Sequence, residues 1–230
     1  MDKMSLQTSR RTAMFAGAAM AVGAAACSTR VPFMAESTPP VPVPARPPIA
    51  PAPIAPAPSR FAVDPRILQK ALAALDEHST TITARDRIAI VDFSAPSSEQ
   101  RLHFLDVASG KASRLLVAHG SGSDPGHTGF LKSFSNAFGS NASSEGAFVT
   151  DNYYVGKHGR SQRLIGLDAT NNNALDRAIV IHSAWYANDE MINAHGKLGR
   201  SQGCFAVGEN KLDDVFAFLG QGRLVYAVRT

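Results

Sequence analysis

The chain has 230 residues, of which 44% are hydrophobic and 18% are charged. Its 23 Lys and Arg stand against 19 Asp and Glu, which leaves a formal net charge of only +4. No basic stripe interleaved with aromatic residues occurs in the sequence, so nothing indicates a nucleic-acid-binding protein, and the weak positive balance fits an anionic polymer as partner.

The first 27 residues have the features of an export signal. Arg10 and Arg11 precede a short apolar stretch over residues 13–26, and small residues stand before Cys27. This order is typical of secretory signals, and the stretch is too short and too weakly apolar to span a bilayer comfortably. The arginine pair favours the twin-arginine route, with an ordinary secretion signal as the alternative.

Residues 24–27, Ala-Ala-Ala-Cys, resemble a bacterial lipoprotein cleavage box, in which the cysteine becomes the first mature residue and carries lipid. Cys27 is therefore expected to anchor the protein to the membrane, and simple secretion to the periplasm is the alternative. Residues 28–60 are rich in Pro and Ala, and the part from Pro39 to Pro58 favours a polyproline II spacer. The predicted organisation is an export signal at 1–27, a linker at 28–60 and one domain at 61–230.

The domain is predicted to begin with a helix. Asp64 is a suitable N-cap, and Pro65 suits the first helical position. Apolar residues recur at helical spacing from Ile67 to Leu75, and we expect the helix to end near residues 78–80.

Strand signals dominate the remainder, apart from a helix expected at residues 209–219 before Gly220. Residues 101–107 and 113–119 flank an Ala-Ser-Gly-Lys turn and indicate a hairpin. The other predicted strands are residues 87–93, 147–150, 164–167, 178–182, 204–207 and 223–228. The predicted fold class is mainly β with a few helices, in a single domain.

Residues 120–144 are rich in Gly, Ser and Asn and suit neither a long strand nor a long helix. No Gly-Lys-Ser/Thr follows the glycines, so this is not a phosphate-binding loop. Long irregular stretches in compact domains are often binding loops. We expect a loop that lines a substrate site, with a plain surface loop as the alternative.

Cys204 is the candidate nucleophile. The only other cysteine is Cys27, in the export signal, so the domain has one thiol and no internal disulfide. Cys204 ends the run Gly-Arg-Ser-Gln-Gly-Cys, which is unlike a core strand, whereas a buried structural cysteine is the general alternative. His182 ends the apolar segment from Ala178, and an imidazole of this kind can take the thiol proton, because the thiolate is the attacking species.

The run from Gly199 to Cys204, together with His182-Ser183, resembles the catalytic signature of the L,D-transpeptidase (YkuD-like) superfamily, in the murein L,D-transpeptidase catalytic-domain branch. The similarity extends over residues 117–123, 156–159, 163–168 and 177–182 and covers the chain from about residue 88 onward. It implies a β-sandwich catalytic domain, a cysteine acyl-enzyme and peptidoglycan stem peptides as substrate. It also implies transfer of the acyl group to an amine on a neighbouring stem.

The predicted catalytic residues are Cys204 as nucleophile and His182 as base and then acid. The resemblance implies that the backbone carbonyl of Ser183 orients the imidazole. The Gly203 and Cys204 amides are plausible oxyanion donors. The predicted substrate-binding residues are Ser201, Arg200, His119, His158 and Gly120. A solvated loop arginine is the alternative for Arg200, and a structural role is the alternative for each of the two histidines.

Two further functions remain open beside cross-linking. The same acyl-enzyme could be hydrolysed, giving an L,D-carboxypeptidase or a wall-bond hydrolase, and the domain could be a non-catalytic wall-binding lipoprotein. Zinc held by Cys204, His182 and a further histidine is a third idea, but no recognisable ligand spacing supports it. We expect no metal and no cofactor, and we expect His78 and His103 at the surface.

Overall fold

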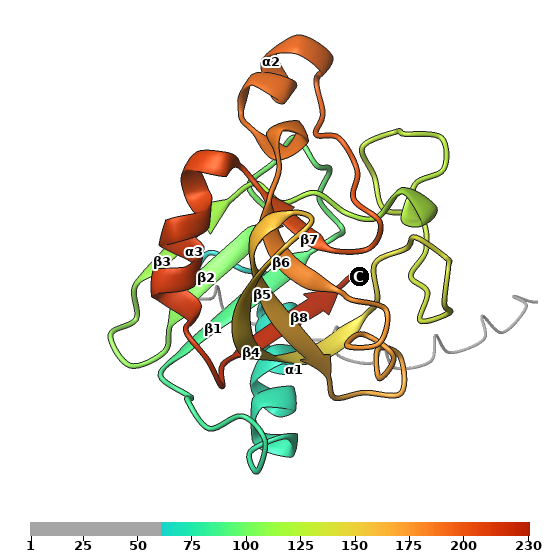
Figure 1. The fold of residues 1–230 in the computed structure, drawn as a ribbon. Coiled ribbons are helices and arrows are strands. Elements are labelled where there is room, and N and C mark those ends of the chain that lie inside the picture. Colours follow the sequence, from blue (N-terminus) through green and yellow to red (C-terminus); the bar gives the residue numbers. More distant parts are fainter. Residues whose placement is uncertain (1–60) are drawn as a thin grey trace, which may run out of the picture. The chain divides into compact units, whose positions relative to one another are not determined.

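The computed structural model describes residues 61–230 (Figure 1). The predicted export signal, the linker and Cys27 lie outside these residues. Within residues 61–230, no helix combines the length and the apolar character needed to cross a membrane.

Eight strands form one mixed sheet in the order β3-β2-β1-β8-β4-β5-β6-β7. The pairs β1–β8 and β6–β7 are parallel, and the other neighbours are antiparallel. The strands are β1 (Arg87–Asp92), β2 (Leu102–Asp106), β3 (Ala112–Leu115), β4 (Gly146–Gly156), β5 (Gly159–Gly166), β6 (Val180–Ser183), β7 (Phe205–Val207) and β8 (Leu224–Val228). The predicted β-rich fold is confirmed.

The predicted β-sandwich takes the form of one curled sheet, whose two halves pack on each other around a shared core. All eight strands belong to one hydrogen-bonded sheet. The sheet curls, because Ala118, three residues beyond edge strand β3, bridges Ala206 in the opposite edge strand β7. Gly120 then bridges Ser201. The chain leaving β3 thus reaches the segment that carries Cys204.

Helix α1 (Pro65–Glu77) covers one face of the sheet. The Asp64 side chain accepts a hydrogen bond from the Arg66 backbone amide at 2.7 Å, which satisfies one of the free amides at the helix start. Loss of such a cap costs about 1 kcal/mol. The buried side of α1, including Ile67 and Leu75, packs on residues of β1, β2, β4 and β8.

The other face of the sheet encloses the larger core. Alternate residues of β1 divide between the two faces, since Ile88 and Ile90 face α1 whereas Ala89 and Val91 join the enclosed core. The enclosed core also contains the buried residues of α3 (Leu212–Leu219). The main aromatic contacts are Phe93 with Phe205 and Phe148 with Phe205.

The β4–β5 hairpin is longer than the sequence predicted. The predicted strands cover residues 147–150 and 164–167, whereas β4 reaches Gly156 and β5 starts at Gly159. Lys157 and His158 form the two-residue connection between the paired glycines. Residues 151–163 are mostly polar and lack apolar alternation, because this part of the hairpin extends beyond the core.

Three smaller features of the structure also differ from what the sequence led us to expect. Strand β3 ends at Leu115 rather than at residue 119. Helix α2 (Glu190–His195) was not predicted, because it is one and a half turns long and buries none of its residues. His103 is buried at 7% exposure, and His78 is half-buried with Nε2 2.8 Å from Asp168, so neither is a free surface residue.

Candidate active site

Cys204 and His182 line the same cavity, which has a volume of about 560 Å³. Cys204 lies just before β7, and His182 lies in the neighbouring parallel strand β6, opposite Ala206. The register of this parallel pair therefore brings the two side chains to one end of the sheet. The cavity is lined by Phe138, Gly139, Asn141, Tyr154, Lys157, His158, Arg177, Ala178, His182, Tyr186, Arg200, Ser201, Gln202 and Cys204.

The Cys204 thiol contacts the backbone just before β6. It donates to the carbonyl oxygen of Ala178 at 3.5 Å. Only 7% of Cys204 is exposed. Ala178 has φ +54°, a left-handed conformation that is uncommon for a residue other than glycine. The strained residue is thus the one that contacts the thiol.

Ser201 orders the turn that presents Cys204. Its hydroxyl donates to the Cys204 carbonyl at 2.7 Å and accepts from the Gly203 amide at 3.1 Å. The Gly203 amide, predicted as an oxyanion donor, is therefore occupied within the turn. Gly203 has φ +112°, and a Cβ atom there would lie 2.7 Å from the Ala142 carbonyl oxygen. The position requires glycine for both its conformation and its space.

The imidazole of His182 is fixed in one tautomer. Its Nδ1 lies 2.8 Å from the Ser183 carbonyl oxygen, in agreement with the role expected for Ser183. Since a carbonyl oxygen only accepts hydrogen bonds, Nδ1 must carry the proton and donate. In the neutral ring, Nε2 is then the nitrogen with the free lone pair. Only 1% of His182 is exposed.

The pKa shifts of this pair favour its uncharged form at rest. Burial lowers the pKa of His182, with the bond to Ser183 acting in the opposite direction. Burial raises the pKa of the Cys204 thiol, while the Val180 amide and the charges of Lys157 and Arg177 lower it. Burial thus disfavours the imidazolium form of His182 and the thiolate form of Cys204.

His158 lies over His182 from the tip of the β4–β5 hairpin. Its ring stacks on that of His182, with centroids 4.4 Å apart. Burial lowers the pKa of His158, and the neighbouring charge of Lys157 lowers it further. His158 also lines the cavity, and its predicted role in substrate binding stays a prediction.

The glycine-rich segment 120–144 contributes one wall of the cavity through Phe138, Gly139 and Asn141. Gly120 lies against the catalytic turn, the turn of residues 201–204 that ends at Cys204. A Cβ atom on Gly120 would be 2.3 Å from the Asn141 carbonyl oxygen and 2.8 Å from the Gly203 Cα. Its role is close packing of two backbones. The segment therefore lines the cavity, as the composition indicated.

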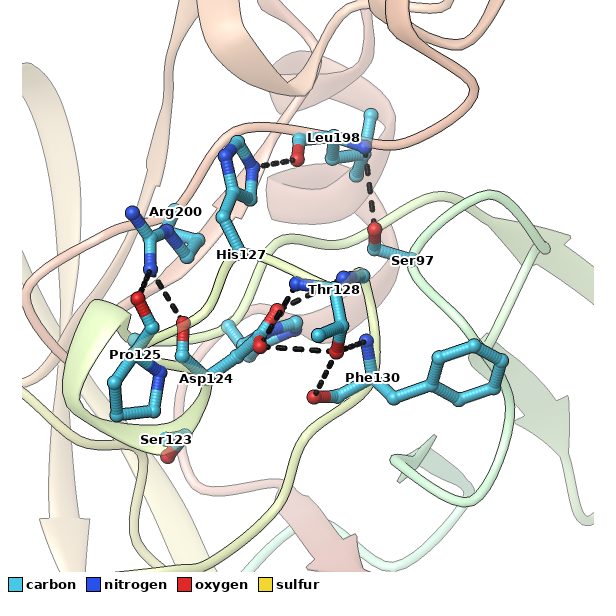
Figure 2. Close-up of polar contacts among 12 residues, drawn as sticks. Ser97, Ser123, Asp124, Pro125, His127, Thr128, Phe130, Leu198 and Arg200 are labelled. Atoms are coloured by element: carbon cyan, nitrogen blue, oxygen red, sulfur yellow. Dashed lines mark hydrogen bonds and ion pairs between the residues drawn. The ribbon is translucent and has the colours of Figure 1, made fainter. Parts of the chain in front are cut away.

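Arg200 contacts this segment rather than pointing freely into the cavity. Figure 2 shows its guanidinium bonded to the carbonyl oxygens of Asp124 and Pro125, the latter at 3.2 Å. His127 reaches the Leu198 carbonyl oxygen at 3.0 Å from the same loop (Figure 2). These hydrogen bonds join the loop of residues 124–127 to residues 198–200, which lead into the catalytic turn.

His119 does not line the cavity, although it was predicted as a substrate-binding residue. It is 1% exposed, and its Nδ1 lies 2.6 Å from an Arg101 nitrogen. Arginine only donates, so Nδ1 accepts and Nε2 carries the proton. Nε2 is 3.4 Å from an Asp124 carboxylate oxygen but misses hydrogen-bond geometry. The His119 carbonyl accepts from the Ser201 amide at 2.9 Å, so this buried group supports the catalytic turn from behind.

Sequence reasoning missed several residues of the cavity. Lys157, Arg177, Tyr154 and Tyr186 were not singled out, although each of them lines it. A signal for Lys157 was present, because two residues between two glycines suit a tight hairpin turn. Arg177 had no comparable local signal. Among residues 61–230, no group of three or more His, Cys, Asp or Glu side chains could hold a metal ion.

Residues 60–228 match the family described as L,D-transpeptidase catalytic domain. The chain belongs to this family. The match covers nearly all of the described residues, including both Cys204 and His182. The resemblance stated from the sequence is thereby confirmed.

Several solved structures are similar to this chain at low identity. The L,D-transpeptidase (Yku) from Stackebrandtia nassauensis shares 14% identity at a TM-score of 0.38, with 74% of this chain and 72% of that one covered. Pgp2, a helical cell shape determining protein from Campylobacter jejuni, shares 14% identity at a TM-score of 0.40, with 76% and 57% covered.

LdtMt1 in complex with imipenem shares 13% identity at a TM-score of 0.38, with 62% of this chain covered, and the match spans 59% of the length of LdtMt1. The match to the Ldtfm-avibactam carbamoyl enzyme spans 49% of the length of that enzyme. No curated protein matched this chain.

Proposed function

We propose that this protein is a peptidoglycan L,D-transpeptidase that forms cross-links through a thioester on Cys204. One observation carries the proposal: the Cys204 thiol and the His182 imidazole open into one cavity, and Nδ1 of His182 is tied to a carbonyl oxygen. The free nitrogen of that ring is then available to move the proton of the thiol.

Acylation begins with transfer of the thiol proton to Nε2 of His182. The sulfur attacks the carbonyl carbon of the amide bond that precedes the terminal D-residue of a donor stem. A tetrahedral intermediate forms and collapses when the C–N bond breaks. The departing amine takes the proton from His182, so a thioester and a free D-amino acid result.

The second half of the reaction reverses the proton movements. An amine on a neighbouring stem attacks the thioester carbonyl and gives a proton to Nε2 of His182. The C–S bond then breaks, the sulfur recovers its proton, and a new amide joins the two stems. The Cys204 amide is the remaining candidate for an oxyanion donor, since the Gly203 amide is bonded to Ser201.

The charge of the cavity supports a substrate that bears carboxylates. Lys157, Arg177 and Arg200 line it, and no Asp or Glu is among its lining residues. Stem peptides end in a free carboxylate, which a cavity of this sign attracts. His158, on the hairpin tip beside Lys157, would contact the same substrate.

The N-terminal features complete the proposal, although they lie outside the described residues. Export by the twin-arginine route and lipid attachment at Cys27 would place the domain at the periplasmic side of a membrane. Residues 39–58 would then act as a spacer of about 60 Å if they are extended as polyproline II. Such a spacer allows a membrane-anchored domain to reach the wall.

Incubation of the full chain with purified muropeptides, followed by mass spectrometry, tests the proposal. Cross-linked dimers with release of a D-amino acid support it. Trimmed monomers without dimers would show that water is the acceptor, and the protein would be an L,D-carboxypeptidase. Absence of both products would favour a wall-binding protein and refute the proposal.

Cys204→Ala is the matched variant for this assay. The change removes the sulfur and leaves the turn bonds of Ser201, which involve the Cys204 carbonyl rather than its side chain. We expect the thioester and all turnover to be lost while the melting temperature stays near that of the unmodified protein. Turnover by this variant would exclude Cys204 as the nucleophile.

A further inference from the structure

Arg177 is held beside the catalytic thiol by neutral oxygen atoms. It immediately precedes Ala178, whose carbonyl contacts the Cys204 sulfur, and its side chain lines the same cavity. Both terminal nitrogens of the guanidinium make two hydrogen bonds each. The acceptors are Ser135 O at 2.8 Å, Ser144 Oγ at 2.6 Å, Ser140 Oγ at 3.1 Å and Ala142 O at 2.6 Å.

No carboxylate neutralises this guanidinium among residues 61–230, because none of the ion pairs there includes Arg177. The side chain is half-buried, and partial burial of a cation without a counter-ion is unfavourable. A negative charge nearby would therefore be stabilised by it. The Cys204 sulfur is the group in the cavity that acquires such a charge during acylation.

The guanidinium also lies against the catalytic turn. A Cβ atom at Gly203 would be 3.3 Å from Nη2 of Arg177 and 2.7 Å from the Ala142 carbonyl oxygen that the same nitrogen binds. Arg177 thus joins two parts of the site. Its backbone directly precedes Ala178, whose carbonyl contacts the sulfur. Its side chain holds segment 135–144 against the turn that carries Cys204.

We propose that Arg177 is a positioning residue for the nucleophile: it clamps segment 135–144 onto the Gly203 turn and supplies a fixed positive charge that stabilises the Cys204 thiolate. The effect of Arg177 on the pKa of the thiol, which is downward and opposes that of burial, agrees with this role. The catalytic use of the thiolate rests on the proposed function, but the reactivity of the sulfur can be measured without any substrate.

Other charged or titratable groups also face the sulfur or border its cavity. Lys157 and His158 come from the hairpin tip, Tyr154 from β4 and His182 from β6. Tyr186 comes from the segment after β6, and Arg200 from the catalytic turn. Lys157 lies at the exposed tip and has no hydrogen-bonded partner among the described residues, so its charge is well hydrated. Lys157 and Arg177 both lower the pKa of the Cys204 thiol, and of the two only the charge of Arg177 is fixed in place, by four hydrogen bonds.

The test is the pH dependence of iodoacetamide alkylation at Cys204 in the full chain, from pH 6 to 11, with the modified peptide quantified by mass spectrometry to exclude Cys27. Arg177→Gln removes the charge and keeps an amide donor, whereas Arg177→Lys keeps the charge. We expect Arg177→Gln to react about tenfold more slowly at pH 7, with its midpoint about one unit higher. Arg177→Lys should stay close to the unmodified protein.

Arg114→Gln is the matched control, because Arg114 is exposed on edge strand β3 and lies outside the cavity. Its alkylation profile should equal that of the unmodified protein. An unchanged profile in folded Arg177→Gln overturns the proposal. If Arg177→Gln and Arg177→Met both fail to fold while Arg177→Lys folds, the positive charge serves folding alone, and the proposal is overturned as well. Muropeptide turnover is scored separately, so loss of the proposed function and loss of this proposal give different results.

Discussion

The imidazole ring of His158 stacks on the ring of His182, with centroids 4.4 Å apart and planes inclined by 22°. The two rings come from different parts of the sheet, one from the β4–β5 hairpin tip and the other from β6. The contact covers one face of the His182 ring. The hairpin tip therefore borders the cavity that holds Cys204 and His182, although it lies beyond the hydrophobic core.

Replacement of His158 separates ring packing from ring chemistry. His158→Phe keeps a planar ring over His182, and we expect it to retain most of the turnover of muropeptides. His158→Ala removes the packing and should lower kcat/KM about tenfold, because a loosely held base loses its orientation. Equal losses in both variants would instead indicate that a His158 nitrogen takes part in the reaction.

The pH dependence of turnover should report the lowered pKa of His182. Burial and the nearby charges of His158 and Lys157 disfavour the imidazolium form. The base is lost only when the pH falls through this lowered pKa, so the acid limb of kcat/KM should lie below the ordinary value of about 6.5.

Lys157→Met provides the matched variant for the pH profile. Removal of this positive charge should move the acid limb upward, toward the ordinary histidine pKa. A downward shift, or an acid limb above pH 6.5 in the unmodified protein, would contradict the assignment of His182 as a buried base.

Gly203→Ala should destabilise the protein and abolish activity. The residue has φ +112°, and the new methyl group would meet Ala142 O at 2.7 Å and Ile179 Cδ1 at 2.8 Å. A loss of about 3 kcal/mol in the free energy of unfolding is expected from backbone strain and overlap together. Urea denaturation and the muropeptide assay measure the two effects.

Gly196→Ala is the control for the conformational part of this change. Gly196 also has a positive φ, of +69°, at the end of α2, but nothing lies within 4 Å of the added atom. Its cost should be only about 1 kcal/mol, with activity kept. A Gly203→Ala protein as stable and active as Gly196→Ala would refute the close packing described for the catalytic turn.

His119 should make the protein less stable in acid. Burial, and then the charge of Arg101, lower its pKa from 6.5 to about 4, so between these values the unfolded chain binds the extra proton. Stability is therefore full above pH 6.5 and falls as the pH decreases toward 4. The difference of 2.5 pH units corresponds to about 3 kcal/mol at most.

His119→Asn tests this dependence, because its side-chain oxygen can replace Nδ1 as the acceptor for Arg101. We expect the free energy of unfolding to fall less steeply between pH 6.5 and 4 than in the unmodified protein. His195→Asn, at the exposed end of α2, should leave the slope unchanged. Parallel slopes in all three proteins would show that His119 is not the group that titrates.

Local sequence signals predicted most of the strands and the terminal helices. Helix α1 begins where Asp64 and Pro65 indicated, and every predicted strand has a counterpart in the sheet. The hairpin beyond Thr150 was not predicted in full, because its ladder of backbone hydrogen bonds needs no apolar alternation. The single sheet could not be predicted either, since curling depends on the bridge between Ala118 and Ala206.

The sequence by itself determined which thiol and which imidazole to consider, because a glycine-rich run before Cys204 and an apolar run before His182 are local patterns. Only the tertiary structure decided that Arg177 lines the cavity that holds the thiol, and that His119 is buried behind the turn. Both outcomes depend on which strands pair and on how segment 120–144 folds back. Such contacts join residues 18 to 42 positions apart, and no spacing along the chain encodes them.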